Sequence, residues 1–545
     1  MKARRRNAVP PLDPDPLNPQ PNAEVLATSY EKQFSPHFPP PARSARLFKF
    51  AHDNTPTLPS GPDITISPKN VTDIIKHLKN RAPGPDRIPN FALKMLPPPT
   101  IDRLTNLYNT VFRLRHFPAP WKIARIVPVP KPGKNPKLPD SYRPISLLNT
   151  TSKILESLIL DKINDHVTDH NLLNQDQFGF RRGHSTTLQL CRIADVVTTN
   201  LSNRRITAMV SLDLSKAFDT IYQDALIFRL HKLDVPVRLV QLIHSYLSHR
   251  TFYVHCNNIS SSRHPITAGV PQGSALGPLL FSLYINNIPK PTDHRIFNAI
   301  YADDTAVVAT SYCPDVLQNI LQPHLDRLDG FFLRYGLKVN PDKCQAIVFS
   351  TRRDIAPPNL TLSNAPLRWI KTIKYLGVTL DSRLTFQHHI KMVKQKAVCR
   401  ILAIRKFLRS PNLSLEAKLT LYKALIRPIV TYASPAWCTI YQSQFDIIEP
   451  VQNRALRYIT NSPTYLHIPT LRRSAGSIES LQEHIRTLNR SFYKKLTSDP
   501  DVNPTLTSLL TAKYSSRSHY QSKKRKRTQD TLEDNTRRDP KRPRH

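Results

Sequence analysis

The sequence lacks a long apolar run. Its most apolar stretch, ALGPLLFSLYI (275–285), is far shorter than the ~20 residues that a membrane-spanning helix needs. The N-terminal MKARRR is followed by prolines rather than by an apolar segment, so no secretory signal is predicted. We therefore expect no membrane partner.

Cysteine is scarce and never closely spaced. The six cysteines contain no CxxC pair, so neither a zinc knuckle nor a disulfide framework is predicted. We expect reduced thiols in an intracellular protein. The segment LIHSYLSHRTFYVHC (242–256) gathers three histidines near Cys256, but their spacing fits no standard metal site, and we interpret it as a surface helix.

Acidic residues are also in short supply. The chain has 40 Asp and Glu against 78 Lys and Arg, which gives a formal net charge of +38. A charge excess of this size indicates a polyanionic partner, either nucleic acid or an anionic membrane. Because the membrane is already disfavoured, nucleic acid is the leading interpretation.

The two ends of the chain differ in composition from its centre. Residues 1–62 contain 13 prolines, so we expect residues 1–64 to be a disordered linker or loosely docked arm, interrupted by a short helix over 23–34. Residues 517–545 hold 11 Lys or Arg against 4 Asp or Glu. We expect residues 513–545 to be a basic disordered tail.

Between these ends, helical and β-rich patterns alternate. Ser67 and Pro68 are typical of a helix start, and an apolar face then follows at helical spacing over 67–80. A second helix is predicted over 223–233. Strands are predicted at 206–214, 298–310, 344–350 and 373–381. From about 385 to 496 the pattern is mostly helical and basic.

The strand ITAMVSLDL (206–214) carries a carboxylate near its end. Successive side chains of a strand alternate between its two faces. One face is apolar throughout and consists of Ile206, Ala208, Val210, Leu212 and Leu214. Thr207, Met209, Ser211 and Asp213 share the other face, which is free to face a cleft.

The stretch NAIYADDTAVVA (298–309) places Asp303 and Asp304 side by side among apolar residues. This pattern predicts a hairpin with the two aspartates at its turn. Two strands of one sheet could bring this pair to Asp213, and three carboxylates in one place need divalent cations. A bare Asp–Asp pair is more often an ordinary turn, so the surrounding motifs decide.

Those motifs resemble the reverse transcriptases of non-LTR (LINE-type) retrotransposons, in the jockey-like branch. YADD (301–304) is accompanied by SLDLSKAFDTI, GVPQGSALGPLLFSLYINNI, QFGFRRGHSTTLQL, GLKVNPDKCQAIVFS, KYLGVTLD and a block over 121–156, all in the family's order and spacing. The resemblance runs from about residue 65 to 460. It implies an RNA-directed DNA polymerase that extends a DNA primer on an RNA template with dNTPs.

The resemblance also implies roles for particular residues. Asp213, Asp303 and Asp304 would bind two Mg²⁺ ions, with Mn²⁺ as an alternative and with Asp213 and Asp303 as the principal ligands. Phe218 would exclude a ribose 2′-hydroxyl, with core packing as the simpler alternative. Gln272 and Gly273 would lie against the template base and the incoming nucleotide.

Further positions belong to the nucleotide and primer sites by the same resemblance. Lys131 and Arg143 would hold the triphosphate or stack on a base, while Lys134 fits a solvated basic loop nearly as well. Lys343 would be a candidate general acid for the pyrophosphate leaving group. Tyr375, Leu376 and Gly377 would form the hairpin that grips the primer.

The implied fold is an α+β right hand, with fingers and an antiparallel palm over 65–381 and a helical thumb region over 382–512. No endonuclease is expected in this chain, since it begins within what looks like the family's linker.

The alternatives to this function are an inactive nucleic-acid-binding relic, and a related polymerase such as a maturase or telomerase. We expect the nucleus, and also the cytoplasm together with the RNA, as the location. The oligomeric state and the role of 434–512 stay open.

Overall fold

The computed structural model describes Leu12 and residues 22–36, 40–53, 63–352, 355–438 and 440–498. The expected basic tail, 513–545, lies outside these residues, as does much of the proline-rich segment. Across the described ranges, no helix combines the length and apolarity needed to cross a bilayer. All six cysteines are described, and none of them forms a disulfide bond.

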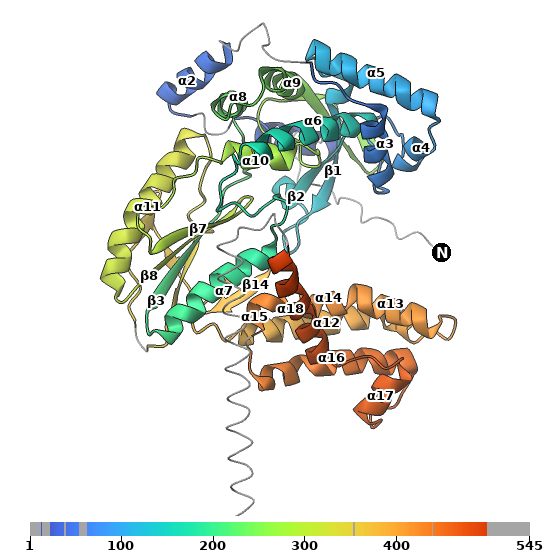
Figure 1. The fold of residues 1–545 in the computed structure, drawn as a ribbon, viewed down its shortest axis with the longest axis vertical. Helices are drawn as coiled ribbons and strands as arrows, with labels where there is room; N and C mark the ends of the chain where they lie inside the picture. The colour runs from blue at the N-terminus through green and yellow to red at the C-terminus, as the bar shows by residue number, and fades with distance from the viewer. Residues whose placement is uncertain are drawn as a thin grey trace, which may run out of the picture.

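A five-stranded sheet, which we call the palm sheet, lies between α11 (Pro314–Arg334) and α7 (Thr186–Ser202) (Figure 1). Its strands in spatial order are β12 (Arg368–Trp369), β9 (Gln345–Phe349), β3 (Ile206–Leu212), β8 (Asp304–Ser311) and β7 (Ile296–Tyr301). β3 runs antiparallel to both β8 and β9, and β7 and β8 form a hairpin. The strands predicted at 206–214 and 344–350 and the hairpin predicted at 298–310 are confirmed.

The palm sheet is covered on both faces. The apolar face of β3 packs in the same core as α11 (Pro314–Arg334), as its alternation predicts. On the opposite face, Thr207 and Met209 are fully buried, and Met209 shares a core with α7 (Thr186–Ser202). The expectation that this face opens into a cleft is therefore wrong along most of the strand. It holds only at the end, where Ser211 and Asp213 are half-exposed.

A second sheet, which we call the fingers sheet, is built from β1 (Ile123–Pro130), β2 (Tyr142–Leu147), β4 (Arg250–Cys256), β5 (Ile259–Ser260) and β6 (His264–Ile266). Segment 242–256 ends one helix, α9 (Val237–Leu247), and then forms β4. The surface-helix interpretation is therefore wrong, because Phe252 and Val254 alternate into the core on β4, as β-branched and aromatic residues favour.

Helices surround the fingers sheet and the upper part of the palm (Figure 1). They are α3 (Pro68–His77), α4 (Asn90–Lys94), α5 (Pro98–Leu114), η1 (Ala119–Lys122), η2 (Pro139–Ser141), α6 (Thr150–Asp169), α8 (Gln223–Lys232) and α10 (Gly277–Tyr284). Ser67 caps α3 as predicted, accepting a hydrogen bond from the Asn70 amide at 3.3 Å. α3 ends at His77, three residues before the predicted end.

Two helices of the N-terminal segment are packed rather than loosely attached. α1 (Asn22–Gln33) matches the predicted short helix and buries Leu26 and Tyr30 in a core with the fingers sheet. α2 (Ala42–Asp53) buries Phe48, whose ring lies 5.2 Å from Phe228 of α8. The expectation of a disordered arm is therefore wrong for these two helices.

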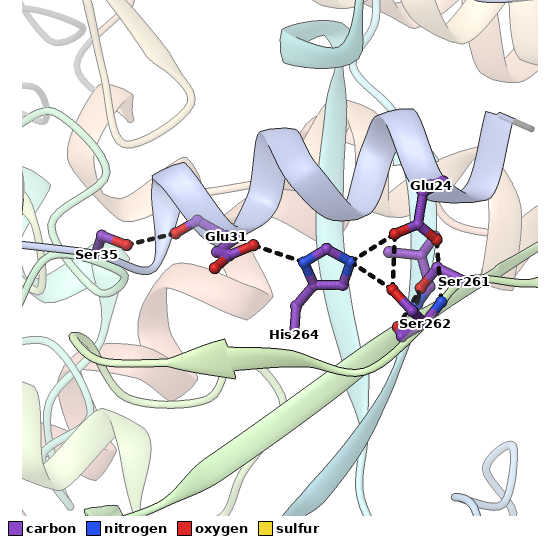
Figure 2. Close-up of polar contacts among 7 residues, drawn as sticks. Glu24, Glu31, Ser35, Ser261, Ser262 and His264 are labelled. Carbon is purple, nitrogen blue, oxygen red and sulfur yellow. Dashed lines mark hydrogen bonds and ion pairs between the residues drawn. The ribbon is translucent and has the colours of Figure 1, made fainter. Parts of the chain in front are cut away.

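A histidine fastens α1 to the edge of the fingers sheet. Figure 2 shows His264 between two glutamates of α1, with Nδ1 2.6 Å from Glu31 Oε2 and Nε2 2.9 Å from Glu24 Oε1. Ser262 adds a hydroxyl hydrogen bond to Glu24 at 2.7 Å. Burial lowers the pKa of His264, but the hydrogen bonds and charges of the two glutamates outweigh it and raise that pKa above its ordinary 6.5.

This clamp predicts a pH-dependent contribution to stability. Because the folded-state pKa of His264 is raised, the stabilisation is fully present below pH 6.5 and is lost as pH rises through the folded-state value. We expect His264→Gln to lower the melting temperature by roughly 1–2 °C at pH 6 and by less at pH 8.5. Thermal unfolding of both proteins at the two pH values measures this. An equal difference at both would contradict it.

The C-terminal part is a group of helices that we call the thumb region, at one end of the molecule (Figure 1). It comprises α12 (Gln387–Leu408), α13 (Leu415–Leu425), α14 (Arg427–Thr431), α15 (Ser434–Trp437), α16 (Gln442–Thr460), α17 (Ile468–Ser474) and α18 (Leu481–Ser498). Trp437 is completely buried within it. The mostly helical pattern predicted from 385 to 496 is confirmed.

Two small hairpins follow β9, one between the palm strands β9 and β12 and one between β12 and the thumb region. They are β10 (Thr361–Leu362) with β11 (Ala365–Pro366), and β13 (Thr372–Tyr375) with β14 (Val378–Asp381). The single strand predicted at 373–381 is therefore wrong, because Leu376 (φ +42°) and Gly377 (φ +85°) form a reversing turn within it. Together the two sheets and the helical thumb region make an α+β right-hand fold.

Candidate active site

Strand register brings the three predicted carboxylates to one end of the palm sheet. Leu212, the last residue of β3, pairs with Thr305 of β8. Asp213 follows Leu212 directly, and Asp304 precedes Thr305 directly, so the two aspartates lie across from one another where the strands end. Asp303 occupies the turn between β7 and β8. Residues ninety positions apart in sequence are thus neighbours.

Gln177, which precedes α7 in the sequence, stabilises the turn that carries Asp303. Ala302 has φ +58°, a left-handed conformation that costs energy for an alanine. Its amide donates to Gln177 Oε1 at 3.0 Å, and the Gly179 amide donates to the same oxygen at 2.7 Å. A Cβ at Gly179 would lie 2.3 Å from the Ala302 nitrogen. Gln177 therefore secures the turn, and it is absent from the predicted site residues.

Burial and neighbouring negative charge raise the pKa of both Asp303 and Asp304. Burial and then the Asp303 and Asp213 charges raise the pKa of Asp304 to about 6. Burial also raises the pKa of Asp303, with a further rise from Asp213 and an opposing effect of Arg143. Both side chains still reach solvent, so water screens part of this repulsion. The two raised pKa values indicate that the surrounding protein does not fully balance the negative charge of the carboxylates.

Basic side chains lie around this acidic end. Lys343 Nζ is 3.4 Å from Asp213 Oδ2. Lys131 lies between the fingers strands β1 and β2, and its Nζ donates to the Asp140 carbonyl at 2.7 Å. Burial lowers the pKa of Lys131, Asp140 opposes this, and Lys216, Arg143 and Lys343 lower it further. Four basic side chains therefore lie close together beside the carboxylates. They are Lys131, Arg143, Lys216 and Lys343.

A hollow of about 470 Å³ is lined in part by Ser215 and Lys216, which follow Asp213 in the sequence. Its lining includes Lys216, Lys338 and Asn340, and the Asn340 amide donates to the Asp213 carbonyl at 2.9 Å. Lys134, by contrast, is exposed in the turn between β1 and β2, as the solvated-loop alternative expects. In the part of the chain that the structure describes, no three histidine, cysteine or acidic side chains converge closely enough to hold a metal ion.

Phe218 lies close to the turn formed by residues 271–274, which we call the PQGS turn. The half-buried Phe218 ring stacks on Phe281 with centroids 4.4 Å apart and planes 23° apart. The Val270 amide, which leads into the PQGS turn, donates to the Phe218 carbonyl at 2.9 Å. Gly273 has φ +119°, and a Cβ there would lie 2.6 Å from the Ser146 carbonyl oxygen. The glycine is thus required by contact with β2.

The predicted primer-grip residues occupy the β13–β14 turn. The Tyr375 hydroxyl donates to the Ala299 carbonyl of β7 at 2.9 Å, which joins this hairpin to the palm sheet. Tyr432 of the thumb region donates to the Leu376 carbonyl at 2.9 Å, and a Cβ at Gly377 would lie 3.1 Å from the Tyr432 ring. Tyr432 was not predicted, because nothing in its local sequence marks it.

Comparison with known proteins agrees with this arrangement. Residues 129–380 match the family model described as "Reverse transcriptase (RNA-dependent DNA polymerase)". The chain is 34% identical over 481 residues to "Probable RNA-directed DNA polymerase from transposon BS" of Drosophila melanogaster, covering 86% of this chain and 52% of that protein. It is 30% identical over 486 residues to "RNA-directed DNA polymerase from mobile element jockey" of the same organism, covering 88% and 53% respectively.

The chain therefore spans about half the length of the curated relatives it matches. Among solved structures, apo telomerase from Candida tropicalis aligns with 12% identity and a TM-score of 0.35, covering 76% of this chain and 74% of that one.

Proposed function

This chain belongs to the reverse transcriptases of non-LTR retrotransposons, in the jockey-like branch, and from that premise we propose that it is an RNA-directed DNA polymerase. It would extend a DNA 3′-hydroxyl along an RNA template with dNTPs. The observation that carries the proposal is the register of β3 against β8, which places Asp213 beside the Asp303–Asp304 turn.

The carboxylates fit hard divalent cations by their donor chemistry. Three acidic side chains supply oxygen ligands only, which Mg²⁺ prefers, and their mutual repulsion is relieved by positive charge. We assign Asp213 and Asp303 as principal ligands and Asp304 as the accessory ligand, with Mn²⁺ as an alternative ion. When bound there, two such ions supply activation of the primer hydroxyl and neutralise the charge that develops on the phosphate.

The surrounding residues complete the proposed chemistry. Lys131 and Arg143 would bind the triphosphate of the incoming nucleotide, since both lie in the cationic group beside the carboxylates. Lys343 would donate a proton to the leaving pyrophosphate, and its ion pair with Asp213 at 3.4 Å supports this role. Gln272 and Gly273 would contact the nascent base pair, and the β13–β14 turn would hold the primer end.

Primer extension by the purified full-length chain tests the proposal. We expect dNTP incorporation on a DNA primer annealed to an RNA template in the presence of Mg²⁺. EDTA should stop it, because the carboxylates then lack their counter-charge, and Mn²⁺ should restore part of it. A chain that binds the duplex but leaves the primer unextended with either ion would instead be the inactive relic.

We propose that the protein acts in the nucleus. The support is the basic composition of residues 517–545, with KKRKR at 523–527 and PKRPRH at 540–545, runs that suit nuclear import receptors. A reporter fused to 517–545 should accumulate in nuclei, whereas the reporter with these basic runs changed to alanine should be diffuse. Diffuse distribution of both would contradict the proposal.

A further inference from the structure

The N-terminal helix α1 reaches a buried carboxylate of the palm, Asp219. This side chain is only 1% exposed. Its Oδ2 accepts a hydrogen bond from Gln33 Nε2, at the end of α1, at 2.7 Å. Gln272 of the PQGS turn directs its own Nε2 at both carboxylate oxygens, at 2.9 and 2.8 Å. Three segments far apart in sequence therefore meet at one carboxylate.

The charge of Asp219 fixes the orientation of both glutamines. Burial raises its pKa to about 6, while hydrogen bonds from Gln33 and Gln272 and the charges of Lys216 and Lys131 act in the opposite direction. The amide donors aimed at both of its oxygens are the partners of an ionised carboxylate, which can only accept hydrogen bonds. Both glutamines must turn Nε2 toward it, so Asp219 determines which end of the Gln272 amide faces away.

The backbone around Asp219 leaves little freedom for this arrangement. Gly269 has φ +81°, and a Cβ there would lie 2.5 Å from the Asp219 carbonyl oxygen. The Gly269 amide donates to the Ile221 carbonyl at 2.8 Å. Thr267 and Ala268 donate their amides to the Phe34 carbonyl, directly after α1, at 3.1 and 2.8 Å. The end of α1, the Asp219 loop and the approach to PQGS thus form one unit.

The rest of α1 is anchored without Gln33. His264, Glu24 and Glu31 hold the helix to the edge of the fingers sheet (Figure 2). Leu26 and Tyr30 add buried apolar contacts. Shortening the Gln33 side chain should therefore remove the contact with Asp219 while α1 stays docked.

We propose that Asp219 and Gln33 are positioning residues for Gln272, so that α1 is a working part of the nucleotide site. The inference rests on the proposed function, since that function gives Gln272 its contact with the nascent base pair. Asp219 acts by orienting the Gln272 amide, and Gln33 acts by keeping Asp219 in place.

Single-nucleotide incorporation at varied dNTP concentration tests this. We expect Asp219→Asn and Gln33→Ala each to lower kcat/KM for the dNTP, by about tenfold and about fivefold, mainly through KM. In a Gln272→Ala background, both substitutions should change kcat/KM less than twofold, because the group they orient is gone. Thr28→Ala, an exposed position on the same helix, should match wild type. Equal losses in both backgrounds would overturn the proposal.

Hydrogen exchange provides a readout that needs no activity. Gln33→Ala should increase amide exchange in 269–277 while 22–32 stay protected. Unchanged exchange in 269–277 would refute the positioning role whether or not the chain extends primers. An inactive wild type with increased exchange at 269–277 would refute the proposed function but support the coupling.

Discussion

Asp303→Asn should lower RNA-templated primer extension by about a thousandfold or more while leaving the protein folded. The substitution keeps the shape of the side chain and removes one carboxylate charge. If Asp303 is a principal ligand for the divalent ions, the loss of that charge weakens ion binding and removes the stabilisation of the developing phosphate charge. The measurement is steady-state nucleotide incorporation at saturating primer–template and dNTP.

The stability of this variant separates a catalytic role from a structural one. The folded state raises the pKa of Asp303, so keeping the group ionised at neutral pH opposes folding. A neutral amide removes this cost, and we expect the melting temperature to stay equal or rise. Natural sites commonly hold such destabilising charges for function.

A matched control is Asp326→Asn. Asp326 is exposed on α11 and accepts a hydrogen bond from Gln322 Nε2 of the same helix at 2.7 Å. The same chemical change there should leave incorporation at the wild-type level. If Asp303→Asn retained the activity of Asp326→Asn, or lost activity only together with a large fall in melting temperature, the metal-ligand role would be wrong.

Features that depend on local periodicity could be predicted from the sequence. The alternation in ITAMVSLDL defines the buried face of β3, and the apolar residues on both sides of YADD define the β7–β8 hairpin. Periodicity alone leaves open whether Asp213 and the Asp303–Asp304 turn belong to neighbouring strands. The resemblance to a known family implied that the three aspartates share one site, and the pairing of β3 with β8 agrees with it.

Features that depend on distant partners could not be predicted. Asp219 lies inside the motif SLDLSKAFDTI, but the motif does not reveal its hydrogen bond with Gln33. That partner is 186 residues away in the sequence. The helix α1 was predicted, but its packing was not, because it depends on partners such as Ile126 and Phe252 that lie far away in the sequence. The β4 segment was mistaken for a helix because a short apolar run with interspersed histidines fits either period.

Phe218 presents the second large effect, which is on sugar selection rather than on rate. Its ring is fixed by stacking on Phe281, so it cannot turn aside for a larger sugar without disturbing a buried residue. We expect Phe218→Val to raise incorporation of ribonucleotides relative to deoxyribonucleotides by about 10- to 100-fold, the range that removing steric exclusion in a pocket supplies. Incorporation of dCTP and CTP opposite a template guanine, measured separately, gives the ratio.

The alternative for Phe218 is core packing alone, and the two roles differ in what they change. A packing role predicts a lower melting temperature and equal losses for both nucleotides, which leaves the ratio at the wild-type value. A sugar-exclusion role predicts a higher kcat/KM for CTP with a smaller change for dCTP. Phe91→Val, at an exposed position on α4, is the matched control and should leave both nucleotides unaffected. The ratio of CTP to dCTP incorporation is measured within each protein, so it is independent of how much of each preparation is active. An unchanged ratio would leave packing as the role of Phe218.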